Sequence, residues 1–174
     1  MRFFIDISYD GSNYHGWQVQ PNADTVQQHI NTALSTILNI KIEVVGAGRT
    51  DTGVHAKQLI AHFDTDISFD IEKTILKMNG FLNSDIAINN IFLVKNDSHA
   101  RFSALSRTYE YRISTLKDPF NSHSLLLYRD LNIKNMNLAC NDIIGTADYS
   151  SFAKFHSDSY TNNCNIYLAK WHLS

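Results

Sequence analysis

The sequence predicts an α+β fold in which helices cover a sheet, and three observations carry this prediction. Apolar and polar residues alternate strictly from 3 to 9, which is typical of a strand with one buried face. Apolar residues then recur at helical intervals from 30 to 38. A second alternation begins at residue 106, so a second cycle of strand and helix follows the first. The 174 residues are 44% hydrophobic, which is enough for a buried core.

The first half of the chain begins with the strand at 3–9 and a loop that carries three aromatic rings within residues 14–17. This number of rings is unusual for a connection expected on the surface. Thr25 and Gln28 have the spacing of a capping box, so we expect the first helix to start there. The next expected elements are strands at 42–47 and 59–63, a helix at 71–81 and a strand at 86–94.

The second half of the chain predicts fewer elements. They are a strand at 106–115, a helix at 135–144, a loop at 145–154 and a strand at 164–173. No helix follows the last strand to cover it, so the sequence looks like a domain cut short. We therefore expect two domains, residues 1–104 and a partial domain at residues 105–174.

The net charge of −2 argues neither for nor against a nucleic-acid partner, because binding depends on where basic residues cluster. The segment 99–117 carries Arg101, Arg107, Arg112 and Lys117 against one acid, Glu110. A solvated strand face explains this segment as well as an RNA-binding surface does. No run approaches the roughly 20 apolar residues of a membrane span, and Asp6 comes too early for a signal peptide. We expect a cytoplasmic protein without a membrane partner.

Asp51 is the main candidate for chemistry. It follows the strand expected at 42–47, precedes Gly53 and has Arg49 two residues before it. A carboxylate beside a guanidinium stays ionised, and an ionised carboxylate can attack carbon as a nucleophile. An aspartate in a turn flanked by glycines more often caps its own backbone, so both interpretations remain open on these residues alone.

Two other interpretations of the same segment fit less well. Asp51-Thr52-Gly53 matches the signature of an aspartic protease, in which two carboxylates of a dimer share one proton. A nearby cation such as Arg49 has no use in that arrangement. The glycines at 46, 48 and 53 meet neither the dinucleotide-binding nor the phosphate-binding fingerprint.

Residues 48–56 (Gly-Arg-Thr-Asp-Thr-Gly-Val-His-Ala) closely resemble the most recognisable motif of the TruA family of tRNA pseudouridine synthases. The resemblance covers the whole chain. The other matching segments, in the order of the family, are 6–18 (Asp-Ile-Ser-Tyr-Asp-Gly-Ser-Asn-Tyr-His-Gly-Trp-Gln), 25–27 (Thr-Val-Gln), 99–104 (His-Ala-Arg-Phe-Ser-Ala), 107–111 (Arg-Thr-Tyr-Glu-Tyr) and 145–152 (Gly-Thr-Ala-Asp-Tyr-Ser-Ser-Phe).

The resemblance implies a fold, a reaction and partners. The fold has two related ferredoxin-like lobes that form a mixed, mainly antiparallel sheet, with helices on one face and an active-site cleft on the other; here the C-terminal lobe is incomplete. The reaction converts uridine to pseudouridine at nucleotides 38–40, in the anticodon stem-loop of tRNA. It uses no cofactor and no metal. Family members act as homodimers with the tRNA across both subunits.

The resemblance also implies roles for residues. Asp51 matches the catalytic aspartate, Arg49 the basic residue that accompanies it, and Tyr109 the aromatic residue that meets the target base. Arg101, Arg107 and Lys57 are candidates for contacts to the RNA backbone. Taken alone, Tyr109 is better explained as a core tyrosine.

One alternative belongs to a different functional class. Family members continue well past residue 174 into a segment that adds to the active site, so the chain is also consistent with an RNA-binding or dimerising module without catalysis.

Overall fold

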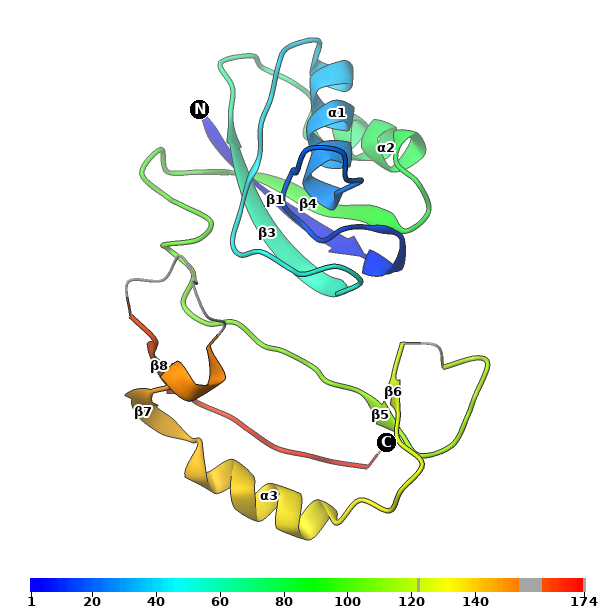
Figure 1. The fold of residues 1–174 in the computed structure, drawn as a ribbon. Coiled ribbons are helices and arrows are strands. Elements are labelled where there is room, and N and C mark those ends of the chain that lie inside the picture. The colour runs from blue at the N-terminus through cyan, green and yellow to red at the C-terminus, as the bar shows by residue number, and fades with distance from the viewer. Residues whose placement is uncertain (122, 154–160, 174) are drawn as a thin grey trace. The chain divides into compact units, whose positions relative to one another are not determined.

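The computed structural model describes residues 1–121, 123–153 and 161–173 (Figure 1). It divides into two compact units, residues 1–108 and 109–174, which are described separately below. Both units combine helices with strands, so the α+β prediction is confirmed. Within the described ranges, no helix has both the length and the apolar character needed to cross a membrane.

The first unit is a four-stranded sheet with two helices. Its elements are β1 (Arg2–Tyr9), the 3-10 turn η1 (Gly11–Asn13), α1 (Val26–Leu38), β2 (Val45–Gly46), β3 (Ala56–Asp64), α2 (Ile71–Phe81) and β4 (Ile86–Val94). The strand order is β2-β3-β1-β4, and all neighbouring strands are antiparallel. β1 is therefore a central strand, paired along both edges.

Both helices of this unit cover the same face of the sheet (Figure 1). Every second residue of β1, from Phe3 to Tyr9, is buried, whereas the residues between them are half-buried. The buried set forms one core with Leu34 of α1 and Met78 of α2. The alternation in the sequence thus predicted correctly which face of β1 lies under the helices.

The start of α1 differs from the predicted capping box. Thr25 is the residue before the helix, as expected, but its side chain makes no capping hydrogen bond. Instead, the N–H groups of Val26 and Gln27 donate to the carbonyl oxygens of Gly16 and Trp17, at 3.2 and 3.0 Å. The loop with the rings of residues 14–17, called here the ring-rich loop, therefore satisfies two of the free N–H groups at the helix start.

β2 is shorter than the strand expected at 42–47 because side chains of α1 bind the backbone there. The N–H of Ile42 donates to Ser35 Oγ at 2.9 Å, and the N–H of Val44 donates to Asn31 Oδ1 at 2.9 Å. Ladder pairing starts only at Val45. At these residues the helix side chains take the place of a neighbouring strand as hydrogen-bond partners. Sequence periodicity does not reveal such bonds.

Among its described residues, the second unit has short strands and one α-helix. Its elements are β5 (Ile113–Ser114), β6 (Leu125–Leu126), α3 (Ile133–Asp142), β7 (Gly145–Asp148), the 3-10 turn η2 (Ser150–Phe152) and β8 (Asn163–Ile166). β5 and β6 pair in parallel, and β7 and β8 pair antiparallel. The helix expected at 135–144 is confirmed, with its start and its end both two residues earlier.

Three expectations for this half of the chain were wrong. The strand expected at 106–115 is limited to β5, since only Ile113 and Ser114 pair with another strand. The loop expected at 145–154 begins with β7, and its residue 154 lies outside the described residues. The strand expected at 164–173 ends at Ile166, and farther on the backbone of Trp171 exchanges two hydrogen bonds, of 2.8 and 2.9 Å, with the Asn137 side chain of α3.

Candidate active site

Asp51 lies in the connection between β2 and β3, residues 47–55, called here the Asp51 loop. The loop leaves the sheet at Ala47, whose N–H donates to the carbonyl of Ile60 at 2.7 Å. Directly after Asp51 the backbone turns: the N–H of Val54 donates to the carbonyl oxygen of Asp51 at 3.2 Å. The backbone of Asp51 closes this turn, so its exposed carboxylate is not required for capping.

Thr50 is the inner residue of the Asp51 loop. Its hydroxyl lies 2.9 Å from the hydroxyl of Tyr9, and its carbonyl oxygen accepts from the N–H of Trp17 at 3.1 Å. Thr50 is half-buried, whereas Arg49 and Asp51 on either side of it are exposed. The loop is thus held through Thr50 and presents its two charged neighbours to solvent.

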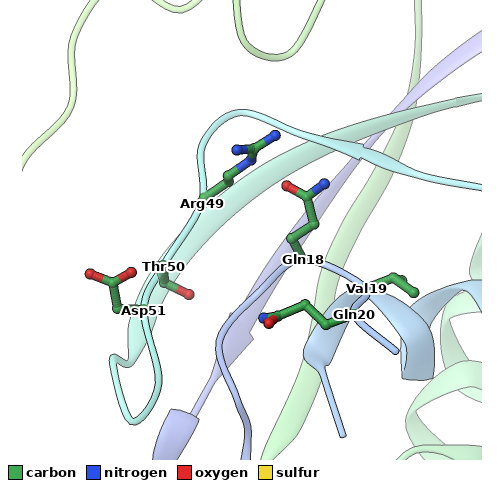
Figure 2. Close-up of a pocket in the computed structure, with 6 residues that line it drawn as sticks. All are labelled: Gln18, Val19, Gln20, Arg49, Thr50 and Asp51. Carbon is green, nitrogen blue, oxygen red and sulfur yellow. The ribbon is translucent and has the colours of Figure 1, made fainter. Parts of the chain in front are cut away.

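A small pocket of about 250 Å³ opens beside the loop (Figure 2). It is lined by Gln18, Val19, Gln20, Arg49, Thr50 and Asp51. In Figure 2 the Gln20 side chain extends toward Thr50. Its Nε2 donates to the carbonyl of His15 at 3.1 Å, which fixes the amide within its own loop. The volume lies below the range of roughly 300–1,000 Å³ common for drug-sized ligands and suits a group as small as one base.

Arg49 lines this pocket together with Asp51. Figure 2 shows the two side chains leaving the loop in different directions. The pairing of the guanidinium with the carboxylate therefore stays a prediction. What the structure brings together is one cation, one carboxylate and two amide side chains around a single opening.

The candidates for RNA contacts lie in two places in the first unit. Lys57 is exposed near the start of β3. Arg101 is exposed in the turn that follows β4, with its guanidinium 5.7 Å from the centre of the Phe102 ring. Arg107 uses its Nη2 group to donate to the carbonyl oxygens of Ala47, at 2.7 Å, and Arg101, at 3.1 Å. Arg107 therefore joins the first residue of the Asp51 loop to the turn that carries Arg101.

Tyr109 is the first residue of the second unit. It is 85% exposed, and it does not belong to a strand. The interpretation of Tyr109 as a core residue is therefore wrong. Its approach to a target base stays a prediction.

His55 and His62, whose spacing in the sequence does not fit a pair of metal ligands, make local structural contacts. His55 Nδ1 accepts from the N–H of Gly11 at 3.1 Å, which connects the end of the Asp51 loop to η1. The same nitrogen lies 2.9 Å from Asp10 Oδ1. His62 is buried in β3, and its Nδ1 accepts from the N–H of Ala100 at 3.3 Å.

Sequence analysis missed the residues that support the loop and part of the pocket lining. Tyr9 and Thr50 each belong to a family motif, and Tyr9 also to the buried face of a strand, but the contact between them was not predicted. Gln20 was not considered. The available signal was the cluster of rings at 14–17, because aromatic side chains in an apparent surface loop indicate that the loop is packed against something. Trp17 is indeed buried.

Comparisons with known proteins bear on this site. A family model described as tRNA pseudouridine synthase matches residues 6–103. The tRNA pseudouridine synthase A of Bacteroides thetaiotaomicron is 46% identical over 171 residues, which are 98% of this chain and 64% of that protein. The tRNA pseudouridine synthase A of Parabacteroides distasonis is 47% identical over 98% of this chain and 68% of its own length.

A relative of lower identity matches a similar share of the chain. The tRNA pseudouridine synthase A of Francisella tularensis subsp. novicida is 40% identical over 97% of this chain and 67% of its own length. The chain thus spans about two thirds of the curated relatives that it matches. The matched region includes the whole Asp51 loop and the residues that support it, and the chain belongs to the tRNA pseudouridine synthase family.

Proposed function

We propose that this chain carries the catalytic aspartate of a tRNA pseudouridine synthase and converts uridine to pseudouridine in the anticodon stem-loop of tRNA. One observation supports this most strongly. Asp51 stands exposed beside a small pocket, on a loop whose backbone, rather than the carboxylate itself, closes the turn. Such a carboxylate is available to act as a nucleophile.

The residue types suit the chemistry of the reaction. The bond from uracil N1 to ribose C1′ breaks, the base turns, and C5 bonds to C1′ in its place; the hydrogen on C5 leaves to solvent and N1 gains a proton. The product is an isomer of the substrate, so no electrons are exchanged with a cofactor. Asp51 supplies the nucleophile, at C1′ or at C6 of the ring, and Tyr109 supplies a surface on which the detached uracil is retained.

The target base must leave its stack before it reaches a pocket of this kind. We assign Arg49 to a contact with the substrate. It lies two residues before Asp51 in the sequence and lines the same pocket. Arg101 and Lys57 are exposed and are assigned to phosphates. Arg107 is assigned first to the two carbonyl oxygens that it binds, which leaves its other N–H groups for RNA.

The finer features of the assembly are part of the same proposal. The strand order β2-β3-β1-β4, with a helix after β1 and another after β3, supports a ferredoxin-like first lobe. A related second lobe, a cleft, a homodimer and a cytoplasmic location rest on the family resemblance. Sedimentation with and without tRNA measures whether one or two chains bind each tRNA.

A second candidate function has one observation in its favour. The curated relatives extend well beyond the length that this chain matches. If the catalytic site needs that additional length, these 174 residues would bind RNA without converting it.

One experiment separates the two candidates. Filter binding to an anticodon stem-loop RNA is measured alongside nucleoside analysis of the same RNA, for the wild-type chain and for Asp51→Ala. Conversion by the wild type that is lost in Asp51→Ala, with binding retained, supports the proposed synthase. Binding without conversion in both proteins would show the binding module instead.

A further inference from the structure

We propose that Tyr9 is a positioning residue for catalysis, which acts through Thr50 to fix the direction in which the Asp51 loop presents Arg49 and Asp51. The inference deepens the function proposed above and rests on it. No contact of Tyr9 with the substrate is required.

Thr50 is held on two sides at once. Its side-chain hydroxyl lies 2.9 Å from the Tyr9 hydroxyl, and either oxygen can donate in this hydrogen bond. Its carbonyl oxygen accepts from the N–H of Trp17 at 3.1 Å. The second bond fixes where the loop passes, but a single backbone bond leaves rotation about it. The Tyr9 bond removes that freedom, because it holds the same residue at a second, separate atom.

In this proposal, Thr50 orients the side chains of Arg49 and Asp51. Both are exposed at the rim of the pocket, one on each side of Thr50. Thr50 is linked to both neighbours by peptide bonds, so fixing its backbone torsions limits the directions in which the flanking side chains leave the loop. Figure 2 shows this arrangement, with Thr50 between two charged side chains that leave the loop.

Tyr9 is a rigid source for this bond. It is the last residue of the central strand β1, where it pairs with Ala56 of β3 on one side and Ile86 of β4 on the other. Its side chain is only 5% exposed, and its ring lies 6.2 Å from that of Trp17, nearly parallel to it. Burial raises the pKa of Tyr9 above its ordinary value of 10.0, so the hydroxyl stays protonated at neutral pH.

A suitable control exists in the same unit. Tyr14 is 2% exposed, and its hydroxyl donates to Asp85 Oδ1 at 2.6 Å, away from Thr50. Tyr14→Phe therefore removes a buried tyrosine hydroxyl and a hydrogen bond to a charged partner, which contributes at least as much to stability as the bond of Tyr9. A merely structural role of Tyr9 predicts that both variants behave alike.

The first arm of the test measures single-turnover conversion of an anticodon stem-loop RNA at saturating protein, together with the dissociation constant for that RNA. We expect Tyr9→Phe to slow conversion about tenfold or more, since a small misplacement of a reacting group has effects of this size. RNA affinity should stay within about twofold. Thr50→Val should reproduce the loss, and Thr50→Ser, which keeps the hydroxyl, should retain most of the rate. Equal rates in Tyr9→Phe and Tyr14→Phe would overturn the proposal.

The second arm does not depend on catalysis. Hydrogen exchange of the amides in residues 47–55 is compared among the wild type, Tyr9→Phe and Tyr14→Phe. Faster exchange in Tyr9→Phe alone supports the positioning role, and unchanged exchange would overturn it. If wild-type conversion is absent, or survives in Asp51→Ala, the proposed function fails. The exchange arm still decides whether Tyr9 fixes the loop.

Discussion

The backbone of Gly16 lies directly against the carbonyl oxygen of Thr50: a Cβ atom added to Gly16 would overlap with that oxygen. Gly16 also has a φ of +85°, in the left-handed region where side chains are disfavoured. Because its own carbonyl accepts from the first N–H of α1, Gly16 cannot easily move away. The start of α1, the ring-rich loop and the Asp51 loop therefore pack against one another.

Gly16→Ala should lower the free energy of unfolding by about 2 kcal/mol or more, through the close contact added to an unfavourable φ. Gly53→Ala is the matched control, because Gly53 has a φ of +77° but an added Cβ would have nothing within 4 Å. It should lose only about 1 kcal/mol. Urea denaturation of both variants measures the difference. Equal decreases in the free energy of unfolding would show that the backbone around Gly16 and Thr50 adjusts to the added Cβ without strain.

His62 should make stability depend on pH. Burial lowers the pKa of His62 from its ordinary value of 6.5, and electrostatic interactions with Arg2 and His99 lower it further, while Asp64 acts in the opposite direction. As the pH falls below 6.5, the unfolded chain takes up the proton first. The contribution of neutral His62 is therefore complete above pH 6.5 and is lost as the pH falls through the lower pKa of the folded state.

The measurement is the free energy of unfolding between pH 7.5 and 5, in the wild type and in His62→Gln, which cannot be protonated. We expect a steeper loss in the wild type toward the acid end. Parallel curves for the two proteins would contradict the assignment of this dependence to His62.

Arg107 and Arg101 should separate into a structural and an RNA-binding arginine. Arg107→Met removes two hydrogen bonds to backbone carbonyls and should lower the free energy of unfolding by about 1 kcal/mol, a value reduced for exposure to solvent. Arg101→Met should leave stability nearly unchanged. Its effect should appear in RNA binding, as a decrease of about one in the slope of log affinity against log salt concentration. A larger slope change for Arg107 than for Arg101 would reverse the assignment.

The sequence predicted the first unit better than the second, and the reason lies in the partners of each segment. In β1 the alternation from Phe3 to Tyr9 reflects one helix-covered face, so the pattern reports real burial. Around Tyr109 and Tyr111 the same alternation has no such cause, because both side chains are exposed. Alternating apolar and polar residues form a strand only where another strand pairs with them and another element covers the apolar face. Neither of these partners can be seen in the local sequence.

The candidate site was predicted in its charged residues but not in their support. Asp51 and Arg49 could be identified because their types and spacing carry chemistry and match a family motif. The hydrogen bond between Tyr9 and Thr50 joins residues 41 positions apart, and the capping of α1 by Gly16 depends on backbone carbonyls that every residue has. Contacts of these kinds leave no local signature in the sequence.

In the proposed reaction, the Asp51 carboxylate is the nucleophile in the isomerisation of uridine. Release of tritium from tRNA labelled at C5 of uridine tests it most directly, because the C5 hydrogen is lost only when C5 forms its new bond. With protein in excess over tRNA, we predict release by the wild-type chain and a rate lower by at least about a thousandfold for Asp51→Asn, which keeps the shape of the side chain without the charge. Comparable release by the two proteins would contradict the assignment of Asp51 as the nucleophile.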